Sequence, residues 1–560
     1  MPNSFRPINS EVLVCIGAGA TAALGMPQTD TQTQIFRKLQ EGKDVEQVLG
    51  NYFDNENLKK VCHLLKILEG SENDIGNLQV TRQNIDHARD IFGMDKGEDI
   101  LRTRILELRR DYDWNALKKI LAICPHNDQN DNLIRDAYSI IDKKLLAGQS
   151  VKVSAGSSQK GPESFSVSRI QGARNFLTLF INLLFAAAWF KIATREKAAE
   201  FKRYQQFLNT FGRMMQEEGR KFHSQRCPLE RREFYLFSTS FVSFNFEMVF
   251  PWILMNSHRQ LNHDGSYIGS HPLKLWLDFG CEHRGRKRQG EKIVPTIEFT
   301  ESVASRENEN NHIGSELNRM GKFYFAHGSS NWRECPNCGR MTFFNGGNNW
   351  NYTDRRLIPP FPIPLFDEVE DGNLTGRERQ LREKRLHFDS LQCMHCGSET
   401  FAFSAPMIMQ TQYKSTPTSF LEEIQRNVKV SLEKARHIIL LGYQLPPDDV
   451  VWQQTFAEAV RSRIDTEEAA YCSVVVGIRG NSEWLYGEKL NTFICQHKGK
   501  QNSQEYGIPA IQNAMAIFGS EKVRAYTGGI PQVFGIGDET AVNELLYPKW
   551  VSWKNTRLEH

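Results

Sequence analysis

The segment from Val12 to Pro27, VLVCIGAGATAALGMP, restricts the fold of this chain more than any other part of the sequence. It begins with the apolar run Val12–Ile16, which is typical of a strand buried on both faces. The glycine-rich Gly17–Gly19 predicts a tight turn, and Ala20–Leu24 predicts the start of a helix. Free backbone N–H groups at such a helix start attract phosphate. We therefore expect a pyrophosphate-containing nucleotide at this turn.

The glycine pattern by itself also fits a turn that binds no ligand. Gly17-x-Gly19-x-x-Ala22 matches the dinucleotide-binding pattern with alanine in the third place. An ordinary dehydrogenase would have a second strand and an acidic residue about 20 positions later. Here the chain continues instead into polar, helical sequence from Gln32 to Leu49, which argues against a dehydrogenase.

Hydrophobic patterns divide the rest of the chain into an α/β part and a helical insertion. Strand patterns alternating with helices predict a doubly wound, mostly parallel, Rossmann-like sheet that includes the first strand. The expected strands are Glu233–Phe250, Gly321–Ala326, His437–Gly442, Ser473–Gly477 and Val523–Tyr526. The expected domains are residues 1–35, 231–330 and 401–557 for the sheet, 36–230 for the helical insertion, and 331–400 for a zinc-ribbon module with an insertion.

The charge balance gives no reason to expect a nucleic-acid or membrane partner. Lys and Arg number 69 against 66 Asp and Glu, so the net charge is only +3. The longest apolar run, Phe176–Phe190, is shorter than the roughly 20 residues that span a bilayer, so we expect a buried helix there. Met1–Ser10 is polar and lacks the features of a signal peptide, which favours a cytoplasmic protein.

Three further segments are expected to be exposed. Gly148–Pro162 has the Gly, Ser and Lys content of a flexible loop, either a tether or a lid. His283–Gly290 is interpreted as a basic loop and Arg377–Arg385 as a mixed-charge helix. Such charge runs are more typical of a solvated face than of an anion site. Any contact with nucleic acid is therefore expected to be indirect or through a partner.

Two Cys-x-x-Cys pairs predict a structural zinc site. Cys335, Cys338, Cys393 and Cys396 supply the four thiolates of a tetrahedral site, and the two-residue gap lets both sulfurs of a pair face one ion. Four protein ligands leave no position for water, so this metal is not expected to catalyse a reaction. The 54 residues between Cys338 and Cys393 predict an insertion, including Leu357–Pro360, that folds out between the pairs. His395 is expected to be exposed rather than a ligand.

Polar residues follow several of the predicted strands, where open α/β sheets bind their ligands. His327 comes directly after a strand that ends at Ala326, and Asn245 lies where an apolar strand gives way to a helical run. Gly442 ends another strand. Asp449, at the start of the next helix, fits a site residue or simply an N-cap. A single histidine in such a place is usually structural, so the position alone does not establish catalysis.

Taken in order, the motifs resemble the prokaryotic SIR2-like family, relatives of the sirtuins. They are Gly-Ala-Gly-Ala-Thr with Leu-Gly-Met-Pro, then Ser-Phe-Asn-Phe-Glu, then His-Gly-Ser-x-x-Trp with the cysteine pairs, then Ile-Leu-Leu-Gly-Tyr-x-Leu-Pro. The likeness covers the N-terminal unit and residues 233–535 and leaves most of the helical insertion unexplained.

This resemblance implies that NAD+ is a substrate, cleaved between nicotinamide and ribose through an oxocarbenium-like transition state. Asn245 would position the ribose hydroxyls or a water, and His327 would act as a base on a ribose hydroxyl or that water. The residues that the resemblance assigns to NAD+ binding are Gly17, Ala18, Gly19, Ala20, Thr21, Pro27, Thr29, Phe244, Glu247, Gly442 and Tyr443.

Three functions stay open under this resemblance. Sirtuin deacylases have a phenylalanine-arginine element after the glycine turn, which Met26–Thr33 lacks, and a peptide-binding Phe-Gly-Glu stretch that is replaced here by Phe401–Ile408. Without that stretch an acyl-lysine peptide has no evident place to add as a strand. Water then becomes the expected acceptor, giving ADP-ribose and nicotinamide. Glu247 stands where many relatives have Asp, which leaves room for a protein that binds NAD+ or ADP-ribose without catalysis.

SIR2-like hydrolases of this architecture resemble effectors of bacterial antiphage systems, in which NAD+ depletion aborts infection. Unregulated hydrolysis would kill the host, so such an enzyme is expected to stay inactive until triggered. The helical insertion and Gly148–Pro162 are the expected places for self-association into a homo-oligomer, or for a sensor or regulatory protein encoded nearby.

Overall fold

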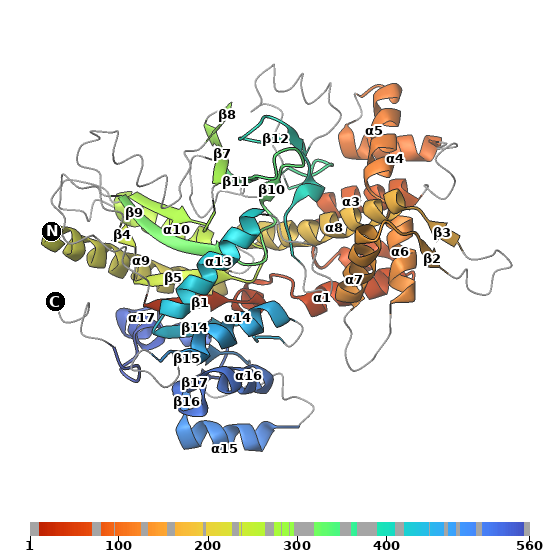
Figure 1. The fold of residues 1–560 in the computed structure, drawn as a ribbon. Helices are drawn as coiled ribbons and strands as arrows, with labels where there is room; N and C mark the ends of the chain where they lie inside the picture. Colours follow the sequence, from red (N-terminus) through yellow and green to blue (C-terminus); the bar gives the residue numbers. More distant parts are fainter. Residues whose placement is uncertain are drawn as a thin grey trace.

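The computed structural model in Figure 1 describes most of the chain. The described residues are 11–69, 80–93, 96–124, 133–153, 163–193, 198–226, 235–236, 238–263, 274–281, 283–289, 292–295, 318–347, 360–366, 389–408, 419–446, 449–463, 469–477, 482–499 and 507–553.

The centre of the protein is a nine-stranded sheet. Eight strands follow the order β16-β17-β15-β14-β1-β5-β9-β4, and β6 also pairs with β9. Within the described part of this sheet, only β16 runs antiparallel to its neighbour. The predicted α/β class with a mostly parallel sheet is therefore confirmed. The strands are β1 (Val12–Ile16), β4 (Tyr235–Leu236), β5 (Thr239–Ser243), β6 (Lys274–Asp278), β9 (Asn318–Phe325), β14 (His437–Leu441), β15 (Tyr471–Val475), β16 (Trp484–Tyr486) and β17 (Val523–Tyr526).

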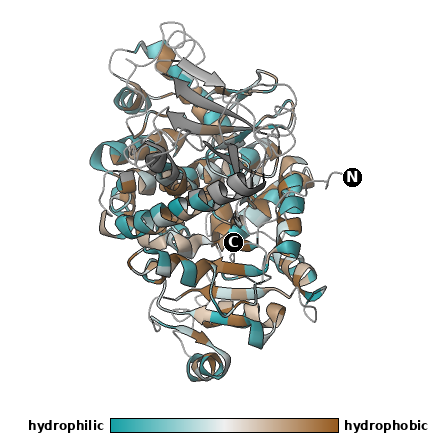
Figure 2. Ribbon diagram, turned by 90° about the vertical axis from the view of Figure 1, so that its left-hand side faces the viewer, coloured by the Kyte–Doolittle hydropathy of each residue, from teal (hydrophilic) through white to brown (hydrophobic). Residues whose placement is uncertain are grey.

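The three central strands are buried along their whole length. Every residue of β1, β5 and β14 is buried, which fits a parallel sheet with both faces covered. Strands of the sheet appear largely brown in Figure 2, the colour of hydrophobic residues. Helix α13 (Ser419–Lys434) contacts β9, and α16 (Ile508–Phe518) contacts β15 and β17. The sheet therefore forms a continuous apolar core with the helices around it.

The register of the sheet brings the ends of four strands into one row. Ile16 of β1 is level with Ser243 of β5 and with Leu441 of β14, and Ser243 is level with Phe325 of β9. Because these strands are parallel, the segments that follow them leave the sheet at the same edge. Strands β5 and β9 lie on one side of β1, and β14, β15 and β17 lie on the other. The order of the strands thus reverses beside β1, where ligands of open α/β sheets bind.

The residues between the glycine turn and β5 are mostly helical, and α1 to α8 lie on the right of Figure 1, whereas α9 lies on the left beside the sheet. The central helix of this insertion, α8 (Val167–Ala193), is long and apolar enough to cross a membrane, but 89% of its most apolar window is buried inside the protein. It is therefore the core helix of the insertion, as predicted for Phe176–Phe190. The other helices are α1 (Thr29–Gln40), α2 (Val45–Leu49), α3 (Asn55–Glu69), α4 (Arg82–Phe92), α5 (Glu98–Asp111), α6 (Trp114–Ile123), α7 (Leu133–Leu146) and α9 (Ala198–Arg226).

The last of these helices, α9, returns to the sheet. It packs along α10 (Val249–His263) and contacts α17 (Glu539–Leu546). The Tyr204 hydroxyl donates a 2.7 Å hydrogen bond to the carbonyl of Ala20, and Thr210 donates one of 2.6 Å to Gly537. Helix α9 therefore fixes the glycine turn from the side of the insertion. The proposed domain boundaries stay a prediction, and α1 runs through the one placed at residue 35.

The helix predicted directly after the glycine turn is not an α-helix. Two short 3-10 turns, η1 (Ala18–Ala20) and η2 (Ala22–Leu24), follow Gly17, and α1 begins only at Thr29. Gly25, with φ of 86°, ends the second turn in the left-handed region, which prevents a continuous helix there. The first α-helical N-terminus therefore lies 12 residues beyond Gly17 rather than at it.

Two other predicted segments are also divided differently. Glu233–Phe250 is not one strand, because β5 ends at Ser243 and α10 begins at Val249. The segment predicted as a loop, Gly148–Pro162, includes β2 (Val151–Val153), which pairs antiparallel with β3 (Glu163–Phe165). Val151 and Val153 are buried, so this alternating triplet forms a strand despite its polar neighbours. Residues 154–162 lie outside the described residues.

The basic segment predicted as a loop is a strand of a second sheet. β7 (His283–Gln289) pairs parallel with β11 (Met341–Gly347) and antiparallel with β8 (Lys292–Pro295). β10 (Trp332–Glu334) completes this four-stranded sheet, which carries the first cysteine pair. Backbone hydrogen bonds to a strand on each side therefore make this segment a strand, although its charge suggests a loop. The predicted mixed-charge helix Arg377–Arg385 lies outside the described residues.

The segment between the cysteine pairs packs inward where it is described. Phe361, Ile363, Leu365 and Phe366 are buried, and the Phe366 N–H donates a 2.8 Å hydrogen bond to the side chain of Asn57 in α3. These apolar side chains join the core of the helical insertion, so the expectation that the segment folds out is wrong for residues 360–366. Residues 357–359 lie outside the described part.

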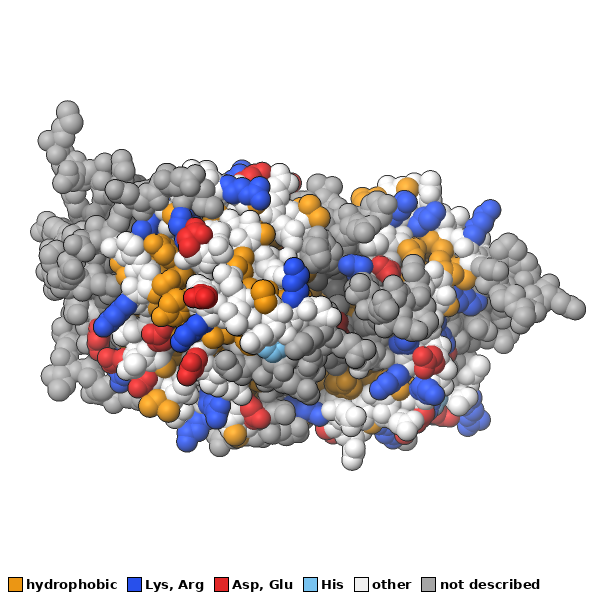
Figure 3. Space-filling view, turned by 90° about the horizontal axis from the view of Figure 1, so that it is seen from below, with side chains coloured by type: hydrophobic (Ala, Val, Ile, Leu, Met, Phe, Trp, Pro, Cys, Tyr) orange, Lys and Arg blue, Asp and Glu red, His pale blue; other side chains and the backbone are white. Residues whose placement is uncertain are grey.

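The face seen from below in Figure 3 carries blue and red side chains close together. Among the described residues of that face, no large patch has a single sign. This mixture agrees with the small net charge of +3.

Candidate functional site

One open cavity lies where β1, β5, β9 and β14 end, with a volume of about 850 Å³ when the open solvent at its mouth is included. The turns after the four strands form one side of it, and α1, α7 and α8 contribute the rest. The lining residues are Gly17, Ala18, Thr21, Met26, Pro27, Thr29, Gln32, Ile134, Arg135, Phe185, Phe244, Asn245, Phe246, Glu247, His327 and Tyr443.

The glycines at these turns allow two backbones to touch. Gly19 N–H donates to the carbonyl of Gly442, and a Cβ on Gly17 would lie 2.5 Å from that carbonyl oxygen. A Cβ on Gly442, where φ is +64°, would overlap the backbone of Gly19 and Ala20. Gly17 and Ala18 reach the cavity, whereas Gly19, Ala20 and Gly442 do not line it. The glycine pattern is thus explained first by close packing of two turns.

A buried carboxylate joins the turn after β1 to the turn after β5. Glu247 Oε1 accepts hydrogen bonds from the Thr21 hydroxyl at 2.8 Å and from Asn245 Nδ2 at 3.0 Å. Its Oε2 accepts from the backbone N–H of Val249 at 2.7 Å. Burial raises the pKa of Glu247, against the lowering effect of these three donors. Glu247 therefore holds the site together through contacts with the protein itself.

Asn245 presents an acceptor to the cavity. Its side-chain Nδ2 donates to the carbonyl of Gly17 at 2.9 Å as well as to Glu247. Both amide protons are thereby used, and Oδ1 has no hydrogen-bond partner in the part of the chain that the structure describes. The side chain is only 8% exposed. A buried acceptor of this kind is suited to a ligand hydroxyl or a water molecule.

His327 lies between two protein acceptors at the end of β9. Its Nδ1 is 3.3 Å from the carbonyl oxygen of Phe244. Its Nε2 is 3.3 Å from Asp449 Oδ2 but is not aligned for a hydrogen bond. The same carboxylate oxygen accepts a 2.9 Å hydrogen bond from the Tyr443 hydroxyl. His327 and Asp449 are 1% and 0% exposed, so the carboxylate that faces Nε2 is screened from water.

Aromatic rings fix the side of the cavity next to His327. The rings of Phe244 and Tyr443 stack with centroids 3.9 Å apart and 1° between their planes. His327 meets Phe244 at 72° with centroids 5.4 Å apart, and Trp452 also contacts both residues edge-on. These contacts leave the imidazole little freedom to rotate, which is a requirement for a positioned base.

A smaller cavity of about 490 Å³ adjoins the first. Met26, Phe185 and Glu247 line both. Asn182 of α8 also lines the smaller cavity, and its Oδ1 has no hydrogen-bond partner among the described residues. Helix α8 of the insertion thus borders both chambers.

The structure brings together most residues that the sequence assigned to the site. Asn245 and His327 line the larger cavity with eight of the expected binding residues, which are Gly17, Ala18, Thr21, Pro27, Thr29, Phe244, Glu247 and Tyr443. The remaining three, Gly19, Ala20 and Gly442, lie behind the turns and shape them.

Sequence reasoning missed the residues that come from the insertion. Ile134 and Arg135 of α7 and Phe185 of α8 line the cavity, but no motif connects them with the glycine turn. Asp449 was foreseen as a site residue or an N-cap. It occupies the N-cap position of α14 (Val450–Arg461), yet its side chain makes no cap hydrogen bond and faces Tyr443 and His327 instead. In the sequence, the only indication of this role is the pair of aspartates, Asp448 and Asp449, that follows Leu445-Pro446-Pro447.

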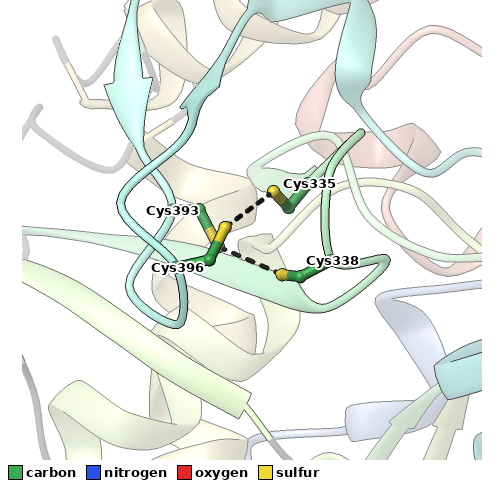
Figure 4. A group of neighbouring side chains, drawn as sticks. All are labelled: Cys335, Cys338, Cys393 and Cys396. Atoms are coloured by element: carbon green, nitrogen blue, oxygen red, sulfur yellow. Dashed lines mark hydrogen bonds between the residues drawn. The ribbon is translucent and has the colours of Figure 1, made fainter.

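The four predicted ligand cysteines form a second candidate site, shown in Figure 4. Cys335 and Cys338 lie in the turn between β10 and β11, and Cys393 and Cys396 lie between β12 (Leu391–Gln392) and β13 (Glu399–Thr400). Both turns have the same local form, in which a left-handed glycine follows the second cysteine. These glycines are Gly339, with φ of 65°, and Gly397, with φ of 76°.

The geometry of the four sulfurs fits a tetrahedral metal ion. The Sγ atoms of Cys335 and Cys396 are 3.5 Å apart, those of Cys338 and Cys393 are 3.6 Å apart, and all four lie within 4.8 Å of one another. Zn–S bonds of about 2.3 Å in a tetrahedron require sulfurs roughly 3.8 Å apart. His395 contacts the Met341 carbonyl oxygen and Arg340 and does not belong to the cluster. The four cysteines could therefore bind a metal such as zinc.

A comparison of the sequence with protein-family models finds no match, and a search of curated protein sequences finds no match either.

Proposed function

We propose that this protein is a SIR2-like NAD+ hydrolase that releases nicotinamide and ADP-ribose. One observation carries the proposal: the turns after β1, β5, β9 and β14 border one cavity, and Asn245 and His327 both line it. The fold we propose is correspondingly a Rossmann-like domain, because its cavity lies where the strand order reverses. Motif order in the sequence supports the same family.

Chemistry at this cavity would proceed by cleavage of the bond between ribose C1′ and the nicotinamide nitrogen. The bonding electron pair leaves with nicotinamide, and water adds to C1′ of the resulting oxocarbenium-like centre. Asn245 Oδ1 accepts a hydrogen bond from a ribose hydroxyl or from that water. His327, which lines the cavity, takes the proton that water loses, and the proton then passes to solvent.

Asp449 and Tyr443 assist His327 in this mechanism. The Asp449 carboxylate is close enough to Nε2 to stabilise the imidazolium formed in the reaction. Tyr443 holds that carboxylate by its hydroxyl and packs its ring on Phe244, so the base and its counter-charge keep one geometry.

A hydrolase is favoured over a deacylase by the position of Phe401–Ile408. The N–H of Ile408 donates a 2.8 Å hydrogen bond to the His327 carbonyl oxygen, and Met407 forms an antiparallel bridge with Gly328. The backbone edge beside His327 is thus already paired with a segment of this chain, so an incoming peptide cannot pair with the same groups.

We further propose that the cysteine cluster holds a structural zinc ion and that the enzyme is a triggered antiphage effector in the cytoplasm. Four thiolates leave no open coordination position. Destruction of NAD+ harms the host, so a homo-oligomer or a sensor protein encoded nearby would control the activity.

Nicotinamide release is the test. Protein alone, and protein with the product of the adjacent gene, are incubated with NAD+ in the presence and absence of an acyl-lysine peptide. We expect nicotinamide without the peptide, and a loss of at least about a hundredfold in His327→Ala and Asn245→Ala. His497→Ala, at a partly exposed histidine of α15 (Gly487–His497), is the matched control and should keep full activity.

The two alternative functions, a deacylase and a non-catalytic sensor, predict different results. Nicotinamide that is released only with the peptide means a deacylase. A protein that binds ADP-ribose but releases no nicotinamide in any mixture is a sensor and contradicts the hydrolase. Release that continues unchanged in His327→Ala would contradict the assigned base.

A further inference from the structure

We propose that Arg135 of α7 binds the diphosphate of the nucleotide. The helical insertion then contributes directly to ligand binding. This inference rests on the proposed function in one respect, because it takes the ligand to be a dinucleotide. It assigns a binding role to a region that the sequence motifs leave unexplained.

The cavity has one cationic side chain among its described lining residues. A diphosphate carries negative charge that the site must balance, and arginine is the residue best suited to bind phosphate oxygens in pairs. Arg135 is the only Lys or Arg among the described residues that line this cavity. Glu247 is the only carboxylate in that lining, and its oxygens are already bonded to Thr21, Asn245 and Val249.

The helix that carries Arg135 lies beside the N-terminus of α1 at the cavity. Helix α7 packs against α1, and Thr29 and Gln32 in the first turn of α1 line the same cavity as Arg135. The N-terminus of α1 therefore adds its positive dipole end to the guanidinium on one side of the cavity. Gly17 and Ala18, where the sequence predicts phosphate, line the cavity as well. Buried Asn245, whose Oδ1 lacks a partner in the described chain, provides an independent sign of a polar ligand.

The Arg135 side chain is 24% exposed, and its Nε lies 3.7 Å from Oδ1 of Asp136, the next residue on α7. A partly exposed contact of this length between neighbours on one helix is weak.

Calorimetric titration of the full chain with ADP-ribose and with adenosine tests this role. Adenosine lacks the phosphates, so it separates loss of the arginine contact from collapse of the cavity. We expect Arg135→Ala to weaken ADP-ribose binding about tenfold to a hundredfold and Arg135→Lys to weaken it less. Adenosine binding should stay unchanged. Lys143→Ala, an exposed cation on the same helix, is the matched control and should bind ADP-ribose like the wild type.

Each contrary result identifies what failed. Equal ADP-ribose affinity in wild type and Arg135→Ala overturns the role of Arg135 and leaves the proposed function standing. An equal loss of adenosine and ADP-ribose affinity also overturns it, because the variant has then disturbed the whole cavity. Wild-type protein that binds neither ADP-ribose nor NAD+ contradicts the proposed function itself and the inference with it.

Discussion

Nε2 of His327 lies 3.3 Å from Oδ2 of Asp449, and both side chains are almost fully buried. The two residues are separated by more than a hundred positions and come from opposite sides of β1 in the sheet. Tyr443 donates a hydrogen bond to the same oxygen. This contact gives the candidate base a fixed counter-charge and leads directly to the first prediction.

Asp449→Asn should lower kcat for nicotinamide release by about tenfold or more and leave the KM for NAD+ nearly unchanged. The amide keeps the size of the carboxylate and can still accept from Tyr443, but it cannot stabilise the imidazolium. Asp538→Asn changes an exposed N-cap residue of α17 and should behave as wild type. An unaltered kcat in Asp449→Asn would contradict the role assigned to this carboxylate.

Gly442→Ala should destabilise the protein by about 2 to 4 kcal/mol and weaken nucleotide binding. The new Cβ would overlap the backbone of Gly19 and Ala20, in addition to the strain of a non-glycine residue at φ of +64°. Gly499→Ala supplies the control, because φ there is +77° but nothing lies within 4 Å of the added atom. It should cost only about 1 kcal/mol in chemical denaturation. Equal losses in both variants would show that the turns do not need to touch.

His437 should make the fold sensitive to mild acid. Burial lowers the pKa of His437 to about 3, helped by the nearby charge of Arg524, whereas the unfolded value is about 6.5. The folded pKa is depressed, so the unfolded chain takes up the proton first. The stability that His437 contributes is therefore complete above about pH 6.5 and is lost as the pH falls toward 3.

The corresponding measurement compares melting temperatures of wild type and His437→Gln between pH 5 and pH 8. Wild type should lose up to about 1.4 kcal/mol per pH unit below pH 6.5 through this group, and the variant should lose correspondingly less. The variant should start from a lower melting temperature, because it disturbs the hydrogen bonds to Leu546 and Ser473. Identical slopes for the two proteins would rule out this source of acid sensitivity.

Cys335→Ser should remove bound zinc and lower the melting temperature, because three thiolates hold the ion more weakly than four. Atomic emission spectroscopy of the purified protein should give about one zinc per wild-type chain and much less in the variant. Cys495→Ser, at an exposed cysteine outside the cluster, should change neither quantity. A wild-type protein without bound metal would refute the zinc assignment.

Much of this architecture could be predicted from local patterns. The apolar runs Val12–Ile16 and His437–Leu441 predict buried strands because parallel strands covered on both faces must be apolar throughout. The two Cys-x-x-Cys-Gly repeats predict two equal turns with sulfurs on one side, and the cluster is present. These features depend on residues close together in the chain, so the sequence carries them directly.

Other features depend on neighbours that the sequence does not identify. His283–Gln289 is charged enough to suggest a loop, but pairing with β8 and β11 makes it a strand. Pro360–Phe366 packs on α3 because that helix offers an apolar surface and the Asn57 amide. Local composition gives no information about such distant partners.

The glycine turns, buried strands and cysteine pairs of the sequence determine the class of the sheet, the cluster of four cysteines and the two polar side chains at strand ends. Tertiary structure alone decides that Asp449 faces His327, that Glu247 joins two turns, and that Arg135 reaches the cavity. The physical reason is that hydrogen bonds and ion contacts between distant residues are set by the register of the sheet and the packing of the helices, which no local pattern encodes.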